Sequence, residues 1–481
     1  MSSIWQNTVE MPRYERLNCD LKTEIAVIGG GMAGLLTACF LKKGGAEVVL
    51  LEGRRIGSGQ TGNTTAKITA QHGLTYAELI RQLGKDAAKQ YASAMEEAVD
   101  EYGRIIKKWK IDCQFMQLPS YLYSCRDTSC LEDEYRAAAL CGMQAELVSQ
   151  TELPFAIQGA LRFDHAAQFH PLRFLSGIAK GLRIYENTKV YEIKGHSIIS
   201  DHGVIEAKKI VIATHFPILN RPGYYFMRMH QERSYVLALS NATTLKGMYY
   251  GIDSDGYSFR SAGQYLLLGG GAHRTGENHG GKYDDLRAVA RQLYPQSREV
   301  ACWSAQDCVT LDRMPYIGQY SASTPDLYVA TGFRKWGMTG AMVSALCLTD
   351  LILRGQERYP IFSPQRFHFS ASAKALMNEG LQSAKGITAE FLTLPIEAAE
   401  SVPRGQGQVV EFRGQKIGVY KEPNGTVHVV STRCSHLGCQ LEWNPDELSW
   451  DCPCHGSRFD YDGRLLDHPA LKGITEDGRC V

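Results

Sequence analysis

The sequence predicts an α/β protein that ends in a small all-β domain, and three observations lead to this prediction. A strand, a glycine-rich turn, a helix and a second strand follow one another between residues 24 and 52. A β-rich stretch lies near Tyr235 to Gly271, and the tail places short strand-like runs around two clusters of cysteine and histidine. The length of 481 residues suggests about three domain-sized units at roughly 150 residues each.

The composition is that of an ordinary globular protein. Hydrophobic residues make up 44% and charged residues 21%, and the net charge of +1 indicates neither a nucleic-acid footprint nor a polybasic membrane surface. The uncharged run from Ile25 to Leu41 is nearly long enough to span a bilayer. Its GGGMAG interior favours strand, turn and helix, so we expect no membrane span. No export signal is visible, and we expect a cytoplasmic protein.

The glycine-rich turn has the spacing of a dinucleotide-binding motif. Gly29, Gly31 and Gly34 form G-x-G-x-x-G after an apolar strand and before a helix. The first glycine permits the tight turn, the second lets the backbone approach a pyrophosphate, and the third lets the helix pack on the strand. Glu52 closes the next strand, where its carboxylate can accept a hydrogen bond from a ribose hydroxyl. These residues predict a Rossmann-like nucleotide-binding domain.

After Glu52 the chain enters GRRIGSGQTGNTTAKITAQHG, a polar loop that suits a long cofactor better than the helix expected of a nicotinamide domain. Together with KKIVIATHFP, CWSAQDCVTLDRMPYIGQ and LYVATGFRKWGMTGAMVSALCLTDLI, it resembles the D-amino-acid-oxidase-like family of FAD-dependent oxidoreductases over residues 24 to 360. The resemblance implies bound FAD and an inserted mixed-sheet substrate domain over the flavin ring. It also implies further FAD contacts at Thr61, Thr65, Val190, Gly337, Met338 and Thr339.

The two clusters in the tail read CSHLGC and DCPCHG. They give Cys434-x-His436 and Cys452-x-x-His455, and two thiolates with two imidazoles can hold zinc as well as iron. Each pair lies on its own glycine-containing loop, whereas a zinc finger needs its histidines on one helix. The segment resembles a Rieske domain, which implies a [2Fe–2S] cluster with Cys434 and Cys452 on one iron and His436 and His455 on the other.

These resemblances divide the chain into three parts. We expect an FAD-dependent unit with interleaved subdomains at residues 1–370, a linker at 371–395 and an all-β Rieske domain at 396–481. Cys439 and Cys454 occupy the positions that form a loop-bridging disulfide in the cytochrome bc-type branch. A reduced pair of thiols remains the alternative, because the cytosol disfavours disulfides.

Two residues are candidate catalytic groups. His72 follows the threonine-rich loop and could face the flavin ring, with a structural role as the alternative. Arg260 could clamp a carboxylate through two parallel hydrogen bonds, or it could lie at the surface beside a turn.

Two further patterns suggest chemistry that we do not expect. Cys308 lies near the position where some sarcosine oxidases tether FAD, but we expect non-covalent FAD and an ordinary thiol. His165 and His170 beside Asp164 resemble the ligands of a mononuclear iron. No second carboxylate stands in the usual place, so we expect no iron there.

The combination of flavin and cluster predicts an oxidoreductase. The first hypothesis is an amine or amino-acid dehydrogenase that passes electrons from FAD through the cluster to an external one-electron carrier. The alternative is a reductase with the reverse flow, from the carrier through the cluster and FAD to an unsaturated substrate. In both cases the partners are a small molecule and a carrier.

Overall fold

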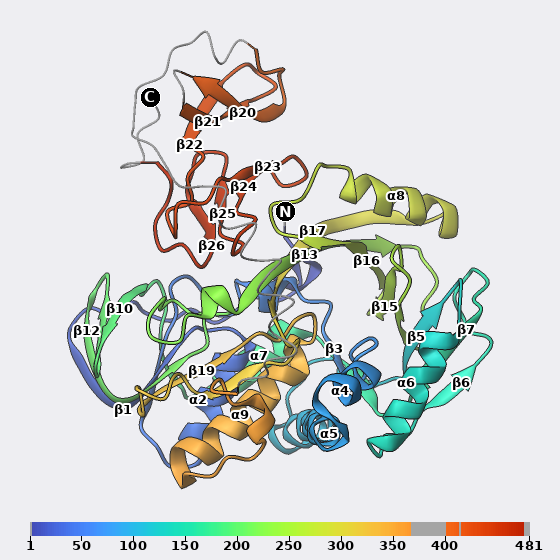
Figure 1. Ribbon diagram of the computed structural model, residues 1–481, viewed down its shortest axis with the longest axis horizontal. Helices are drawn as coiled ribbons and strands as arrows, with labels where there is room; N and C mark the ends of the chain where they lie inside the picture. Colours follow the sequence, from blue (N-terminus) through green and yellow to red (C-terminus); the bar gives the residue numbers. More distant parts are fainter. Residues whose placement is uncertain (1, 367–400, 413–414, 476–481) are drawn as a thin grey trace.

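The structure is a computed structural model that describes residues 2–366, 401–412 and 415–475. Figure 1 shows a large body formed by the first part of the chain and a small domain of C-terminal strands on top of it. The expected linker at 371–395 lies outside the described residues, as does the start of the expected tail domain at 396–400.

The first layer of the body is a sheet with the order β10-β11-β12-β1-β2-β9, in which β19 also pairs with β12 and β18 pairs with β19. β1 runs parallel to β2 and β12, and β12 runs parallel to β19, as expected of a Rossmann-like domain. The strands of this sheet are β1 (Leu21–Ile28), β2 (Val48–Leu51), β9 (Arg183–Tyr185), β10 (Val190–Lys194), β11 (Ser197–Ser200), β12 (Gly203–Ile212), β18 (Tyr316–Gln319) and β19 (Leu327–Thr331).

Helices cover this sheet and form most of the main core. α2 packs against α9, and α9 packs against α5, with fully buried side chains such as Leu35, Leu36 and Val343 between them. The helices are α1 (Ile4–Asn7), α2 (Met32–Lys43), α3 (Gln60–Asn63), α4 (Tyr76–Leu83), α5 (Lys85–Trp109), α6 (Ser129–Leu140), α7 (Pro171–Ala179), α8 (Lys282–Leu293) and α9 (Gly337–Arg354), with 3-10 turns η1 (Tyr225–Met227) and η2 (Pro360–Phe362).

The run from Ile25 to Leu41 is strand, turn and helix, as predicted. Within the described residues, α9 is the helix that is long and apolar enough to cross a bilayer. It lies in the core against α2, and two thirds of it is buried inside the protein. It therefore has the surroundings of a core helix.

The second layer is the expected mixed sheet, with the order β17-β13-β16-β15-β14-β5-β7-β6. All its neighbours pair antiparallel except β14 and β5, which are parallel. Its strands are β5 (Ser120–Ser124), β6 (Glu146–Val148), β7 (Gly159–Phe163), β13 (Met229–Ser240), β14 (Met248–Gly251), β15 (Ser258–Ala262), β16 (Tyr265–Arg274) and β17 (Arg298–Thr310). A small third sheet consists of β3 (Lys67–Thr69), β8 (Ala166–Gln168) and β4 (Met116–Gln117).

The tail domain is all-β, as predicted. It contains one sheet of β20 (Gln406–Phe412), β21 (Gln415–Lys421) and β22 (Val427–Ser431), and another of β23 (Glu442–Asn444), β24 (Ser449–Asp451), β25 (Arg458–Asp460) and β26 (Leu465–Asp467). Trp450 and Phe459 are fully buried in its core. A Cβ at Gly418 would lie 2.6 Å from the Trp450 ring, so the absence of a side chain there lets the ring pack against β21.

A buried ionic network joins the tail domain to the second sheet of the body. Arg233 on β13 is 2% exposed and pairs with Glu447, which also pairs with Arg458 at 3.1 Å. Arg458 in turn contacts Asp451 at 2.9 Å and Asp467 at 3.1 Å. Removing one member of a buried ion pair is costly because it leaves a charge without compensation. The network therefore favours one fixed docking position for the tail.

Candidate active site and metal centre

The glycine turn between β1 and α2 has the geometry that its motif predicts. Gly29 has φ +112°, and a Cβ there would lie 2.4 Å from the Ala213 carbonyl oxygen. A Cβ at Gly34 would lie 1.9 Å from the Gly29 carbonyl oxygen, which leaves no space for a side chain between helix and strand. Glu52 accepts hydrogen bonds from the backbone N–H of Gly30 at 2.6 Å and of Arg54 at 2.8 Å. Its carboxylate therefore braces the turn at the cavity edge.

A cavity of about 730 Å³ starts at this turn and runs between the first and second sheets. This volume is within the range of cofactor and ligand pockets, ~300–1,000 Å³. The N-terminus of α9 lies at its wall, where free backbone N–H groups favour electron-rich ligand atoms. The predicted cofactor residues that line it are Gly29, Gly31, Glu52, Thr61, Thr65, Val190, Gly337 and Met338.

Two predicted cofactor residues do not line the cavity. Gly34 lies behind the turn, where it serves the contact between helix and strand. Thr339 is turned inward, and its hydroxyl lies 3.0 Å from Nε2 of His72. Thr339 is thus part of the support beneath the cavity wall.

The two predicted catalytic residues also lie behind the wall. The His72 ring stacks on Trp336 at 4.7 Å, and its Nδ1 is 2.6 Å from the Tyr91 hydroxyl. Burial lowers the pKa of His72 to about 3, so the ring is neutral. Arg260 is 2% exposed and donates through Nη1 to the carbonyls of Thr65 and Ala66 at 2.6 and 2.7 Å. These buried local contacts favour structural roles for both residues and leave contact with substrate a prediction; they also show that Arg260 does not lie at the surface.

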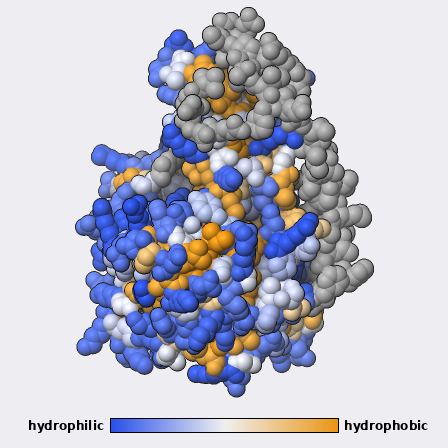
Figure 2. Space-filling model, turned by 90° about the vertical axis from the view of Figure 1, so that its left-hand side faces the viewer, coloured by the Kyte–Doolittle hydropathy of each residue, from blue (hydrophilic) through white to orange (hydrophobic). Residues whose placement is uncertain are grey.

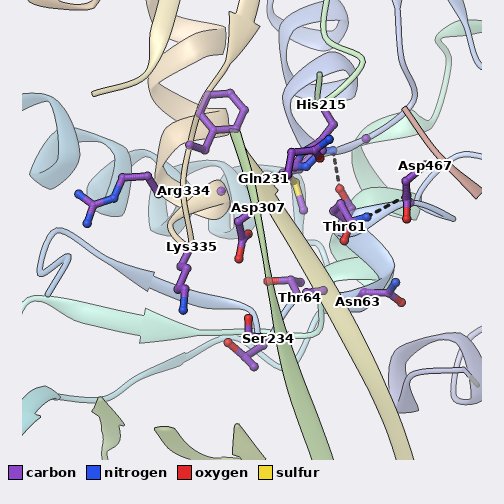
Figure 3. Close-up of a pocket in the computed structure, with 18 of the residues that line it drawn as sticks. Thr61, Asn63, Thr64, His215, Gln231, Ser234, Asp307, Arg334, Lys335 and Asp467 are labelled. Carbon is purple, nitrogen blue, oxygen red and sulfur yellow. Dashed lines mark hydrogen bonds between the residues drawn. The ribbon is translucent and has the colours of Figure 1, made fainter. Parts of the chain in front are cut away.

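Several polar residues that no sequence motif indicated also line the cavity. Figure 3 shows Asp307, Lys335 and Ser234 in it, and Asp307 and Lys335 direct their charged ends into the same space. Burial raises the pKa of Asp307 to about 7, although Lys335 opposes the shift. Lys67 also lines the cavity, and burial lowers its pKa to about 7. The alternation of β17 was the available signal for Asp307, since Cys308 next to it faces the core.

The tail domain closes one side of the cavity. Leu465, Leu466, Asp467 and His468 are lining residues, and Figure 3 shows Asp467 beside the residues of the body. Gln231 on β13 also lines the cavity, and its Nε2 donates to the backbone carbonyls of His455 at 2.7 Å and His468 at 2.9 Å. One side chain therefore contacts both the cavity and a loop of the predicted metal centre.

The two loops that carry the predicted metal ligands have the same backbone design. The Gly438 N–H donates to the Cys434 carbonyl at 2.8 Å, and the Gly456 N–H donates to the Cys452 carbonyl at 2.9 Å. The two glycines have φ of +80° and +83°, which permits the tight return of each loop. The predicted ligands thus come from two matched turns and not from a zinc-finger helix.

The ligand atoms face a common space between the loops. Nδ1 of His436 and Nδ1 of His455 are buried without a partner, and the two rings lie 5.1 Å apart at 89°. Hydrogen bonds, first with Cys452 and also with Ser457, lower the pKa of Cys434 to about 7. Two thiols and two unsatisfied imidazole nitrogens fit the mixed donor set of a histidine-ligated cluster.

The neighbouring cysteines are free thiols in this structure. The sulfur atoms of Cys439, Cys452 and Cys454 all lie within 4.8 Å of one another. Cys439 and Cys454 are close enough for a bridge between the loops, so the expected disulfide stays a prediction.

The geometry does not support a mononuclear iron site at His165 and His170 or a covalent flavin link at Cys308, neither of which we expect. His165 contacts Asp100 at 2.8 Å, whereas His170 accepts from Arg173 N–H and contacts Thr8, so the two rings serve different neighbours. The Cys308 thiol is buried 3.5 Å from the carbonyl of His215 and does not line the cavity.

The comparisons agree with this division into cavity and metal centre. The family model for FAD dependent oxidoreductase matches residues 24–351, and that for the Rieske [2Fe-2S] domain matches residues 393–476. The chain belongs to the FAD-dependent oxidoreductase family and carries a Rieske domain. The protein YhfW of Bacillus subtilis (strain 168), which is named as a Rieske 2Fe-2S iron-sulfur protein, is 34% identical to this chain. The match covers 98% of this chain and 97% of YhfW.

Other similar proteins cover the FAD-dependent part. Gamma-glutamylputrescine oxidoreductase of Escherichia coli (strain K12) is 24% identical over 73% of this chain and 88% of its own. L-proline dehydrogenase from P. horikoshii has the same fold, with a TM-score of 0.62, 19% identity, and coverage of 73% of this chain and 99% of that protein. The predicted fold class, FAD and [2Fe–2S] cluster are thereby confirmed.

Proposed function

We propose that this FAD-dependent oxidoreductase oxidises an amine or amino acid at a carbon that bears nitrogen, and that the electrons leave through the Rieske domain to an external one-electron carrier. The direct contact of Gln231 with both the cavity and the His455 loop carries the proposal. The activities named for the similar proteins, on gamma-glutamylputrescine and proline, support the substrate class.

The residues at the two ends of the cavity have different roles, one end for the nucleotide and the other for the substrate. The glycine turn and Glu52 hold the nucleotide end, and α9 presents its N-terminal N–H groups through Gly337 and Met338. Asp307 offers a carboxylate that can pair with an ammonium group, and Lys335 beside it can bind an anionic group. Such a pair of opposite charges suits a substrate with both an amine and a polar end.

The electron count explains why a flavoprotein would carry this tail. Bound FAD supplies a two-electron hydride acceptor, and the cluster transfers one electron at a time. Oxidation of one CH–NH group to an imine releases a hydride equivalent and a proton, so two oxidised carriers are consumed for each substrate. The chain holds the second cluster loop against the cavity wall through Gln231 and Gln306, whose Nε2 donates to the Gly456 carbonyl at 2.8 Å.

Anaerobic titration with a panel of amines and amino acids tests this proposal. A substrate should bleach the flavin absorbance and produce the electron paramagnetic resonance signal of the reduced cluster in the same sample. Reduction of the flavin by a reduced carrier, with no bleaching by any amine, would instead support the reverse flow.

A further inference from the structure

The two loops that hold the predicted cluster have different surroundings. The second loop, Cys452–Ser457, is held against the body. Arg274 donates to the carbonyl of Pro453 at 3.0 Å, and a Cβ at Gly456 would lie 2.6 Å from the Gln231 Cβ. The first loop, Cys434–Cys439, instead reaches the surface, where Ser435 and Leu437 are exposed. The cluster site is therefore closed on the cavity side and accessible on the other.

Three chain segments meet around His436 on the accessible side. Nε2 of His436 lies 2.7 Å from the Asn220 side-chain oxygen, and its ring contacts Phe226 with the ring centroids 6.1 Å apart. Next to it, the Ser435 hydroxyl donates to the Lys472 carbonyl at 2.7 Å. Segments 215–228 and 468–473 thus each contact the segment 433–439, which contains the first ligand loop.

This surface is apolar at its centre. Tyr224 is 45% exposed, Met227 is 50% exposed and Leu437 is 43% exposed. They are three of the large hydrophobic side chains that the described part of the chain exposes, and each is within two residues of Phe226 or His436. Figure 2 shows apolar surface at the neck where the small domain meets the body. Exposed apolar side chains that gather in one place, rimmed by polar residues, mark a surface for protein–protein interaction.

The charged residues of the three segments are all basic. The three segments contain Arg221, Arg228, Arg433 and Lys472 and no aspartate or glutamate, although the whole chain has a net charge of only +1. Arg221 and Lys472 are exposed, whereas Arg228 is partly covered by its contact with the Pro364 carbonyl. The nearby carboxylate of Asp201 accepts from the Lys189 backbone, and the Lys189 ammonium donates to the Leu471 carbonyl. The cations that face solvent therefore attract an acidic partner.

We propose that the His436 patch, defined as Arg221, Tyr224, Met227, Leu437 and Lys472, is the docking surface of a small acidic one-electron carrier protein. This inference rests on the proposed function and names the partner of the same electron path. The cavity side and the carrier side then use different ligand loops, the His455 loop and the His436 loop. Each docked carrier exchanges one electron with the cluster, so one substrate needs two docking events. Weak electron-transfer complexes have small interfaces, and charge steering gives them fast association.

Binding to the full-length protein with both cofactors tests the patch without any substrate. The probe is oxidised plant plastocyanin, an acidic one-electron acceptor, titrated into oxidised enzyme by calorimetry at low salt. Arg221→Glu with Lys472→Glu should raise the Kd at least about tenfold, because two attractions become repulsions. The control, Lys107→Glu with Lys108→Glu on α5, makes the same change in net charge at exposed positions far from the patch and should change the Kd less than about twofold.

A second measurement tests the apolar centre. Leu437→Ser should slow oxidation of the dithionite-reduced cluster by plastocyanin several-fold, with the spectrum of the cluster unchanged. The proposal that the His436 patch binds an acidic carrier would be contradicted by either of two results. One is an equal loss of binding in the Lys107 and Lys108 control, and the other is tighter binding of a basic cytochrome c than of plastocyanin.

The outcomes also separate this inference from the function on which it rests. If amines bleach the flavin but the patch variants bind plastocyanin normally, the function stands and the docking surface is wrong. If no amine reacts while the patch variants still lose binding, the docking surface stands and the substrate class is wrong. A plant-type ferredoxin, an acidic one-electron donor, used in place of plastocyanin, shows whether the same patch serves the reverse flow.

Discussion

The two cofactor sites of this chain are assembled in opposite ways. The predicted cluster ligands come from two neighbouring loops between Cys434 and His455, which repeat one backbone turn. The FAD cavity is lined by segments from Ile28 to His468, and the tail domain supplies part of its wall. A site made from adjacent loops can keep its geometry when the surroundings change, whereas a site made from distant segments depends on how the domains dock.

The sharpest test of this difference removes one cluster ligand. Cys452→Ser should abolish the cluster, because a hydroxyl is a poorer ligand than a thiolate for this centre. Iron and acid-labile sulfide should be lost, while FAD content and bleaching by substrate remain. Anaerobic transfer to the carrier should fall by more than about a hundredfold, because the external path then lacks its one-electron centre.

The controls for Cys452→Ser are spectroscopic. Ser431→Ala, on β22 of the same domain, should keep the iron and the signal of the reduced cluster. Full carrier turnover in Cys452→Ser would mean that the tail does not carry the electrons. Loss of FAD in the same variant would show that the cavity depends on an intact tail.

The docking of the tail domain on the body can be weakened without changing a predicted cluster ligand. Arg233→Met removes a buried cation that pairs with Glu447 and donates to Gln306 at 2.8 Å. We expect a loss of about 3 kcal/mol in stability, near the low end for a broken buried pair because Arg458 still pairs with Glu447. Calorimetric unfolding should show the loss, with the cluster spectrum intact and the transfer of electrons from flavin to cluster slowed.

An exposed ion pair gives the matched control for Arg233→Met. Arg136 pairs with Asp133, and both side chains are 65% exposed. Arg136→Met should therefore cost less than about 1 kcal/mol. Similar losses for the two variants would contradict the role of the buried network in fixing the tail.

The opposite end of the cavity can be tested through Glu52. Glu52→Ala removes two hydrogen bonds to backbone N–H groups and a carboxylate beside the nucleotide end. FAD retention should weaken by about tenfold or more, since hydrogen bonds to charged groups contribute about 1.5–3 kcal/mol. Glu24→Ala, which removes a bond to the Glu47 N–H on the surface, should retain FAD as the parent does. Unchanged FAD content in Glu52→Ala would place the nucleotide elsewhere.

The same contrast explains what the sequence could predict. The cluster ligands and the glycine turn are readable because a few consecutive residues determine both the backbone shape and the side-chain positions. The mixed sheet was also expected, but its register was not, and register decides that Asp307 faces the cavity while Cys308 faces the core. The role of His72 stayed open between the flavin ring and the core because the sequence does not reveal its stacking on Trp336. Gln231 was missed because its partner at His455 lies 224 residues away.

The smallest expected effect concerns the charge of Asp307. Burial raises the pKa of this carboxyl to about 7, so it is protonated and neutral below that pH and anionic above it. A cationic amine pairs only with the anion, and its apparent affinity should therefore rise as the pH increases through about 7. Asp307→Asn should remove this rise and raise the KM above pH 7 by up to about fivefold, the value of a partly solvated ion pair.

A measurement of stability without substrate checks the same titration. The folded pKa lies above the ordinary value of an aspartate, so the folded state retains this proton to higher pH than the unfolded state does. Stability of the flavin-free parent should therefore decline as the pH rises toward and through 7, and Asp307→Asn should lack that part of the decline. The melting temperature of the variant relative to the parent should consequently be higher at pH 8 than at pH 5. A constant difference between the two proteins across this range would mean that Asp307 does not titrate there, and the pH dependence of KM would then need another group.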